Sequence, residues 1–386
     1  MKANIITFVI ASILFSTFSA DAQNTNQKAE GYRGIWFTLG QVNTQYGDKY
    51  SGGLGTYTVK HIPLAIYSPE VDKTFFVYGG TPSADQTYLV CMAGCYDHKT
   101  GMLQRPVTVH DKGQIGVIDP HDNPTIQIDK DGYVWVFVAG RGNTRPGIRY
   151  RSTKPYDISS FEYINESIMA YPQVHYDNEK GFFVFFTRYD GKRRIFYMTS
   201  KDGVTWTDYK PVASIMEPGE NLSGHYQLTN YNGKKLVCTF NRHPDGKVDQ
   251  RTNIYYIESE DWGKTWTNAA GEKVELPVTR EDGPALVKNF RKDGRNCYIK
   301  DINFDKDGNP VILYLTSDNH LTGPDGGIRE WNVAYWNGQK WNHTHITRST
   351  HCYDSGSLYI DGDTWTVIAP TEAGPQYWGT GGEMAV

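Results

Sequence analysis

One histidine of this chain, His121, stands in a run that is rich in Asp and Pro, Ile118–Asp131. The run leads into an expected strand at Thr125–Ile128, and an Asp-Gly turn joins that strand to an aromatic one at Tyr133–Val138. Polar groups placed where a loop enters a rigid sheet are common in active sites, and a histidine can act as a base near neutral pH. The alternative is that His121 and Asp122 only bond the backbone of their own loop, as Asx turns do.

Other imidazole and carboxylate groups of the chain suit a metal ion. If they converged in the fold, they would form a structural Ca²⁺ or Zn²⁺ site. The candidates are His225, His243, His351 and Asp354. The five cysteines show no paired metal-type spacing beyond one Cys-x-x-x-Cys at 91–95, and their odd number leaves at least one thiol unpaired. The sequence therefore assigns no metal to a reaction and leaves a structural ion open.

The chain begins with a charged start, a short apolar run at Ile5–Phe18 and an A-x-A-like site. This pattern predicts a signal peptide over Met1–Ala22, so we expect an exported, periplasmic or secreted protein. The apolar run is too short for an ordinary membrane span. The net charge of −4 and the lack of a basic block argue against nucleic acid as a partner. We expect a soluble monomer with no membrane partner.

Short β-like runs recur along the chain, separated by Asp-Gly, Asn-Gly and Gly-Gly turns. Aromatic residues make up 14% of the chain and there are 39 glycines, which is typical of β architecture with many turns. Besides the two strands above, strands are expected at Thr74–Tyr78, Thr87–Met92, Phe182–Thr187, Arg194–Thr199, Lys235–Phe240, Asn253–Glu258, Val311–Leu315, Asn332–Trp336, Ser357–Ile360 and Trp365–Ala369.

A repeat of the pattern Ser-x-Asp-(x)-Gly-x-Thr-Trp occurs at Ser200–Trp206 and Ser259–Trp266. It is the Asp box, a hairpin turn of β-propellers in which the Asp and Ser side chains bond the turn backbone. The two copies are 59 residues apart, from Asp202 to Asp261, which suits one blade per repeat. We therefore expect one all-β propeller domain over residues 23–386, of about six to eight blades at roughly 45–60 residues each.

Ordered motifs link these elements: Gly31–Trp36, Lys49–Tyr57, Asp72–Gly80, His121–Pro124, Tyr171–Gln173, Gly224–Gln227, Arg251–Asn253, Tyr353–Leu358 and Gly381–Met384. From about Gly31 to the end they resemble the BNR-4 propeller family. The resemblance implies a seven-bladed propeller that acts on polysaccharides containing uronate and rhamnose. Members continue past the last motif with a further blade, so we expect this chain to stop before its final blade.

The resemblance to the lyases of this family implies catalytic roles for His121, Tyr171 and Arg188. Elimination at a uronate needs a base for the C5 proton, a cation for the carboxylate and an acid for the leaving oxygen. His121 suits the base, Arg188 can fork onto the carboxylate, and Tyr171 can protonate the leaving group. Substrate binding is expected from a wider set of residues. These are Asn123, Arg141, His225, Tyr226 and Arg251.

Two departures from the family pattern keep the reaction open. Ulvan-type lyases often carry a second histidine where this chain has Arg141. The rhamnosidase branch uses an N-terminal histidine, for which Gln41 or His61 is the candidate here. We put first an α-L-rhamnosidase-like hydrolase that cleaves rhamnose–glucuronate linkages. A uronate lyase and a non-catalytic glycan-binding propeller are the alternatives, and each has an acidic polysaccharide as its partner.

Overall fold

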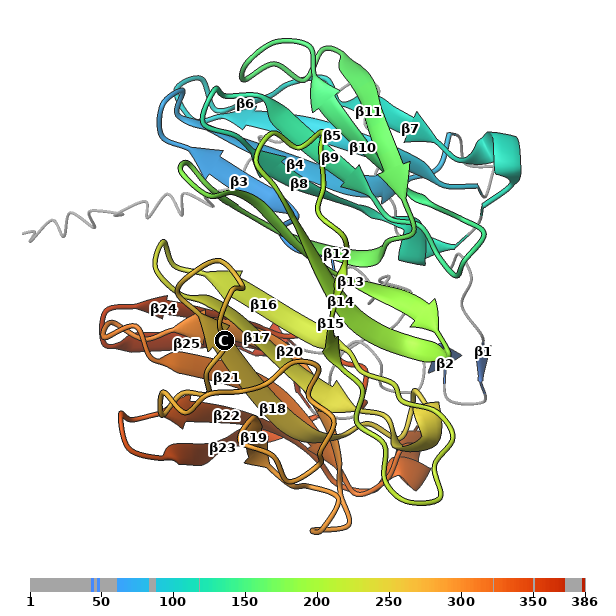
Figure 1. The fold of residues 1–386 in the computed structure, drawn as a ribbon. Helices are drawn as coiled ribbons and strands as arrows, with labels where there is room; N and C mark the ends of the chain where they lie inside the picture. Colours follow the sequence, from blue (N-terminus) through green and yellow to red (C-terminus); the bar gives the residue numbers. More distant parts are fainter. Residues whose placement is uncertain are drawn as a thin grey trace, which may run out of the picture.

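The computed structural model describes residues 61–82, 88–117, 119–321, 323–349 and 351–371, and three short strands outside them. Regular structure in these residues is almost entirely β, with short 3-10 turns between strands (Figure 1). The prediction of an all-β chain is confirmed. Within the described residues, no helix is long and apolar enough to cross a membrane. The expected signal peptide and Gln41 lie outside them.

The described strands form antiparallel sheets whose strand order mostly follows the chain. The first contains β3 (Ala65–Ser68), β4 (Lys73–Gly80), β5 (Val90–Asp97), β6 (Met102–Leu103) and β7 (Val107–Asp111), and the second β8 (Pro124–Ile128), β9 (Val134–Val138), β10 (Gly147–Ser152) and β11 (Phe161–Ser167). The third contains β12 (Ala170–Asp177), β13 (Gly181–Asp190), β14 (Lys192–Ser200) and β15 (Lys210–Ala213), and the fourth β16 (Gln227–Tyr231), β17 (Leu236–Arg242), β18 (Thr252–Ser259) and β19 (Leu286–Lys288). The fifth contains β20 (Asn296–Phe304), β21 (Pro310–Ser317), β22 (Arg329–Trp336) and β23 (Trp341–Ser349), and the sixth β24 (Ser357–Asp361), β25 (Thr364–Pro370) and β26 (Met384–Ala385). A separate pair joins β1 (Asn43–Thr44) to β2 (Gly47–Asp48).

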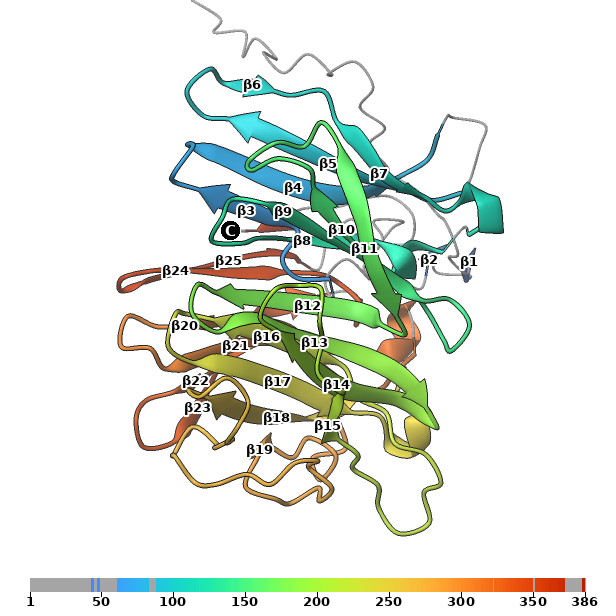
Figure 2. The same ribbon diagram turned by 45° about the horizontal axis from the view of Figure 1, so that its top comes forward.

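Successive sheets lie beside one another as consecutive blades. Strand β8 contacts β4, β12 contacts β8, β16 contacts β12, β20 contacts β16 and β24 contacts β20. Figures 1 and 2 show this succession from two directions. We call β8, β12, β16, β20 and β24 the inner strands. Because all of them run in the same sense through their blades, the loops that enter them gather at one end, which we call the mouth.

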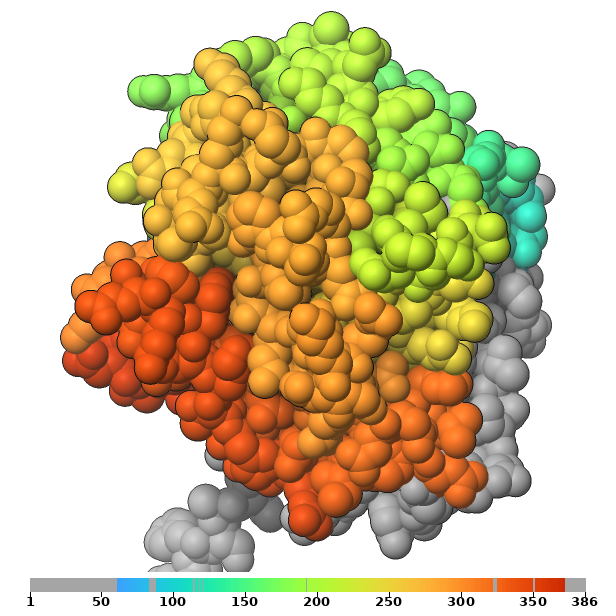
Figure 3. Space-filling model, turned by 60° about the horizontal axis from the view of Figure 1, so that its bottom comes forward, coloured from blue at the N-terminus to red at the C-terminus, as the bar shows by residue number. Residues whose placement is uncertain are grey.

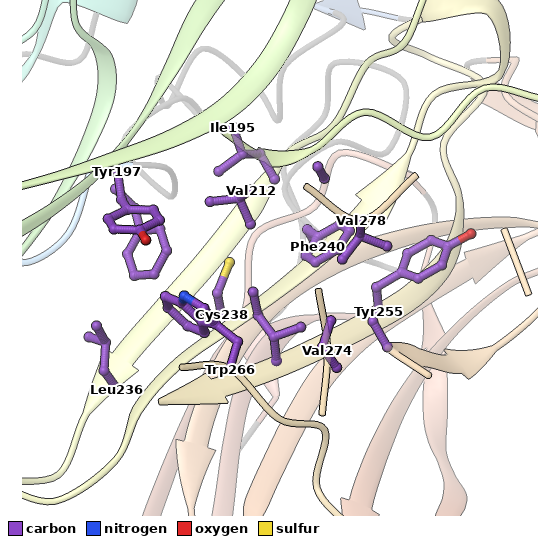
Figure 4. Close-up of a cluster of buried hydrophobic side chains, with 14 of the residues drawn as sticks. Ile195, Tyr197, Val212, Leu236, Cys238, Phe240, Tyr255, Trp266, Val274 and Val278 are labelled. Atoms are coloured by element: carbon purple, nitrogen blue, oxygen red, sulfur yellow. The ribbon is translucent and has the colours of Figure 1, made fainter. Parts of the chain in front are cut away.

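Apolar packing between neighbouring blades makes the frame rigid. One buried cluster joins Ile195, Tyr197 and Val212 of the third sheet to Leu236 and Phe240 of the fourth (Figure 4). The segment between β18 and β19 adds Trp266, Val274 and Val278 to this cluster. Figure 3 shows this segment, coloured amber, on the surface of the molecule. Such a core fixes the blades against each other, and so fixes the loops at the mouth.

Both Asp boxes have the expected geometry. Asp202 Oδ1 accepts the backbone N–H of Val204 at 2.9 Å and of Thr205 at 2.7 Å. Its glycine, Gly203, has φ +73°, and a Cβ there would lie 2.4 Å from Trp135 of the preceding sheet. The glycine is therefore required both by the turn and by the close approach of the neighbouring blade.

Candidate active site

Two of the predicted catalytic residues meet at the mouth. His121 lies just before β8 and Tyr171 at the start of β12, with ring centroids 5.6 Å apart. Tyr226, which precedes β16, is 5.3 Å from Tyr171 by ring centroids, and the two hydroxyls are 3.3 Å apart. Three consecutive blades therefore contribute one side chain each to a shared group.

The backbone of Tyr171 is in an unusual conformation. Its φ is +50°, in the left-handed region that residues with a Cβ rarely adopt, and the β12–β13 pairing shifts register between Ala170 and Gln173. Such a conformation costs on the order of 1–3 kcal/mol and is concentrated at functional sites. The bulge turns the Tyr171 side chain toward its neighbours at the mouth, where a regular strand would aim it elsewhere.

The ring of His61 also lies near Tyr171, with ring centroids 5.7 Å apart. The residue after it, Ile62, pairs with Gln173 in parallel fashion, so this segment runs beside β12. The buried His61 places Nε2 at 2.9 Å from the carbonyl oxygen of His121. His61 thus fixes the position of the His121 backbone.

Asp119 sets the state of His121. It accepts a hydrogen bond from the His121 ring through Oδ1 and from Arg141 through Oδ2. Burial alone would raise the pKa of Asp119, but the bonds from His121 and the charge of Arg141 hold it well below its usual range. Burial lowers the pKa of His121 to about 4 against the pull of Asp119. His121 is therefore neutral near pH 7. Its Nδ1 lies between the Asp119 carboxylate and Arg141 Nη1, which is 2.7 Å away, and the tautomer whose Nδ1 proton is directed to Asp119 has Nε2 as its basic nitrogen.

A second ionic network, centred on Asp122, contacts the same loop. The fully buried Asp122 accepts bonds from Lys112 Nζ at 2.5 Å and from Arg145 Nη2 at 2.7 Å. Asn123 packs onto β4, where a Cβ on Gly79 would lie 2.0 Å from its Oδ1. These contacts give Asp122 and Asn123 a role in positioning His121. The partners of the Asp122 carboxylate are side chains, whereas the alternative reading expected it to bond the backbone of its own loop.

The structure brings a different arginine to the group than the predicted Arg188. The guanidinium of Arg188 lies over Tyr209, 3.8 Å from the ring centroid. Its strand neighbour Tyr189 packs with Tyr171 and Tyr226, and Tyr189 pairs with Arg193 across the β13–β14 hairpin. Side chains of adjacent strand residues point to opposite faces, so Arg188 and Tyr189 face different blades.

Arg193 is the cation that faces the tyrosines. Burial opposes its charge, but Tyr226, Tyr171 and Tyr189 raise the pKa of Arg193 above its ordinary value. Arg141 shows the same balance, with burial opposed by Tyr171 and Asp119. Arg141 is paired with Asp119, whereas Arg193 has no carboxylate partner within the described residues. Arg193 is thus the cation available to an anionic substrate.

The expected histidine cluster does not form. The two ring nitrogens of His225 are engaged by backbone groups, Nδ1 with the oxygen of Asn241 at 3.0 Å and Nε2 with the N–H of Ile215 at 3.2 Å. His225 therefore has no nitrogen left for a sugar or a metal. His243 instead contacts the Tyr226 ring, 4.9 Å between centroids, and His351 accepts the N–H of Tyr353. Among the described residues, no group of three or more His, Cys, Asp or Glu is placed to hold a metal ion.

The remaining candidates divide by location. Arg251 lies next to Tyr226, with its guanidinium carbon 4.6 Å from the ring centroid. Gln41 is outside the described residues. All five cysteines are buried, and none of them forms a disulfide within the described residues. The described site therefore consists of His121, Tyr171 and Tyr226 with their arginine and carboxylate neighbours.

Comparison with known proteins places this geometry in context. A family model described as "BNR repeat-containing family member" matches residues 85–349. The chain is 25% identical over 285 residues to an ulvan lyase from Nonlabens ulvanivorans, covering 64% of this chain and 59% of the relative. It is also 25% identical over 344 residues to "Ulvan Lyase-PL25" from Pseudoalteromonas sp. (strain PLSV), covering 79% of this chain and 68% of the relative. The chain thus spans under two thirds of the first of these proteins.

Solved structures agree on the fold. A polysaccharide lyase PL25 ulvan lyase superposes with a TM-score of 0.67 at 19% identity, covering 81% of this chain and 78% of the other. The same values hold for that lyase bound to -[GlcA(1-4)Rha3S]-. At this identity the likeness extends to the arrangement of sheets, which is propeller-like in both.

Proposed function

Because the chain belongs to the BNR repeat-containing family, and because its named relatives are ulvan lyases, we propose that it is a polysaccharide lyase that cleaves a uronate-containing chain by β-elimination. The relatives favour this reaction over the rhamnosidase-like hydrolysis that the sequence analysis put first. The observation that carries the proposal is the left-handed Tyr171, with its hydroxyl beside Tyr226 and its ring near those of His61 and His121.

The proton steps follow from the hydrogen bonds. Asp119 holds the Nδ1 proton of His121, so Nε2 is the nitrogen that takes the C5 proton of the uronate. The electrons of that C–H bond form the C4–C5 double bond while the C4–O bond breaks. Tyr171 gives its phenolic proton to the leaving oxygen. His121 then releases the C5 proton to water, and the phenolate of Tyr171 takes up a proton from water.

The removal of the C5 proton also needs a cation at the uronate carboxylate, and we assign this role to Arg193. Negative charge builds on the uronate carboxylate as the proton leaves, and a cation held in place stabilises that charge. Arg193 faces Tyr171 and Tyr226 and has no carboxylate partner within the described residues. A guanidinium binds a carboxylate with two parallel hydrogen bonds, which also fixes the orientation of the sugar. The charge of Arg141 is shared with Asp119, so we assign it to His121 and Asp119 rather than to substrate.

One set of assays separates elimination, hydrolysis and binding without catalysis. The purified protein is incubated with ulvan, and the near-ultraviolet absorbance of the unsaturated uronate is followed together with free rhamnose. Growth of that absorbance supports elimination. Release of rhamnose without it would mean hydrolysis. Binding of the polymer with neither product would mean a glycan-binding propeller.

The proposal also includes the location of the protein, its number of blades and its oligomeric state. The protein is exported to the periplasm or the medium, which rests on the Met1–Ala22 pattern. Its propeller has seven blades, which rests on the succession of described sheets and on the family. It acts as a monomer. N-terminal sequencing of the secreted product and size-exclusion chromatography with light scattering test the first and last of these.

A further inference from the structure

A second cationic group lies at the mouth beyond Tyr226. Arg251 is only 6% exposed, and its guanidinium carbon lies 4.6 Å from the ring centroid of Tyr226, 4.9 Å from that of Tyr353 and 5.4 Å from that of Tyr298. We call these three rings the tyrosine cage. Cation–π contacts of this kind stabilise the charge from its faces and leave the N–H donors at its edge unused.

The cage itself is fixed by hydrogen bonds at its rim. The Tyr298 hydroxyl donates to the backbone oxygen of Asp249 at 2.6 Å, and the Tyr353 hydroxyl donates to the Asp249 carboxylate. Arg251 Nε donates to the oxygen of Val248 at 2.9 Å. The rings and one edge of the guanidinium therefore have little freedom to move.

The terminal nitrogens of Arg251 have no such partner. Within the described residues Arg251 makes no ion pair, and its Nη groups make no hydrogen bond. A buried cation without a paired carboxylate is costly, and proteins rarely keep one without a functional reason. The neighbouring Lys300 is also buried and donates to the backbone oxygen of Cys352 at 3.0 Å, and burial together with the charge of Arg251 lowers the pKa of Lys300 to about 7. The Asp249 carboxylate accepts from Tyr353 and acts on Arg251 through its charge, so the terminal N–H donors of Arg251 remain available to a further anion.

The position of the cage indicates where that anion comes from. Arg193 and Arg251 both face Tyr226, and Tyr226 is the ring next to Tyr171. We propose that Arg251 binds an anionic substituent, in ulvan a sulfate ester, on the sugar next to the uronate held at Tyr171. This inference rests on the proposed lyase function, and it adds a charge-reading subsite to it. A guanidinium with free terminal donors matches the oxygens of a sulfate ester.

The test compares ulvan with chemically desulfated ulvan. For the wild type we expect kcat/KM to be higher on the sulfated polymer by about tenfold or more, as for a charge-assisted hydrogen bond. Arg251→Met should reduce that preference to about one, because the loss falls on the sulfated polymer. Arg105→Met, at an exposed arginine, is the matched control and should keep the preference.

Two further readouts separate the possible failures. Arg251→Met removes a buried unpaired charge but keeps a flexible side chain against the rings, so its melting temperature should stay level or rise. If Arg251→Met slows both polymers equally, or keeps the preference, the sulfate subsite is wrong. If the wild type forms no unsaturated product, the lyase proposal fails. In that case calorimetric titration with sulfated and desulfated oligosaccharides still tests the role of Arg251. If Arg251→Met weakens binding of the sulfated oligosaccharide alone, the subsite is supported even though no catalysis is seen.

Discussion

Replacing Tyr171 by Phe removes one oxygen from the centre of the proposed site and leaves the ring in place. The ring keeps its neighbours His61, His121 and Tyr226, whose centroids lie within 5.7 Å. The phenol makes a hydrogen bond of 3.3 Å with the Tyr226 hydroxyl. A hydrogen bond of this kind contributes about 0.5–1.5 kcal/mol, and this one is long. We therefore expect the free energy of unfolding to fall by about 1 kcal/mol or less.

The effect on the reaction should be far larger. A positioned general acid contributes roughly 10²–10⁴-fold to a rate. Without the phenolic proton the leaving oxygen must take its proton from water, so kcat of Tyr171→Phe should fall by at least about 100-fold. The expected outcome is a protein with nearly unchanged melting temperature that makes unsaturated uronate very slowly. Initial rates of product absorbance and thermal melts measured on the same preparation check it.

A matched variant controls for the loss of any hydroxyl. Tyr359 is 57% exposed and lies on β24, so Tyr359→Phe should change neither the rate nor the melting temperature. A kcat for Tyr171→Phe within about tenfold of the wild type would refute the role of the phenol as the acid, since such a loss is below what general acid catalysis supplies. A large drop in melting temperature would show instead that the hydroxyl is structural.

Further outcomes follow from the same geometry. Arg193→Lys should lower kcat/KM by at least about tenfold because an ammonium cannot bind a carboxylate bidentately, whereas Arg188→Lys, on the other face of β13, should change it by less than about twofold. Asp261→Ala should lower the free energy of unfolding by roughly 2 kcal/mol through the loss of its Asp-box bonds, and leave kcat per folded molecule unchanged. Stability should fall as the pH drops below 6.5 toward 3, because burial lowers the pKa of three histidines from 6.5 to about 3 and only the unfolded chain binds their protons. Melts across this range, with proton uptake on unfolding at pH 5, check this for His175, His225 and His351.

The sequence predicted the middle strands of the blades best. Strands such as β13 and β21 are largely apolar on both faces because a blade lies on each side. All of β21 is buried, and β13 is buried from Gly181 to Thr187. The inner strands were mostly missed, since they carry polar residues that bond across to the next blade. Gln173 on β12, for example, donates to the backbone oxygen of Gln227 on β16 at 2.9 Å. Patterns of apolar residues give no signal for a strand that is stabilised in this way.

The catalytic candidates were predictable to the extent that their positions follow from the starts of inner strands. His121 and Tyr171 precede or open such strands, and each carries a motif of its own. Arg193 was missed although the Asp190–Gly191 turn fixes its pairing with Tyr189. Pairing alone cannot say which face of β13 meets the mouth, because both faces of that strand are buried and aromatic. What the sequence does not show is which residues of the neighbouring blades contact each face of β13.

The architecture explains how this site can tolerate so many unfavourable features. Tyr171 has a left-handed φ, and Arg193 and Arg251 have no carboxylate partner within the described residues. Each feature costs on the order of a kilocalorie per mole or more, which is a large part of the net stability of about 5–15 kcal/mol that proteins have. Apolar clusters such as the one in Figure 4 lie between neighbouring blades, so the core can offset these costs while polar groups remain at the mouth. Separate placement of core and mouth therefore leaves uncompensated positive charge where an acidic polysaccharide can bind it.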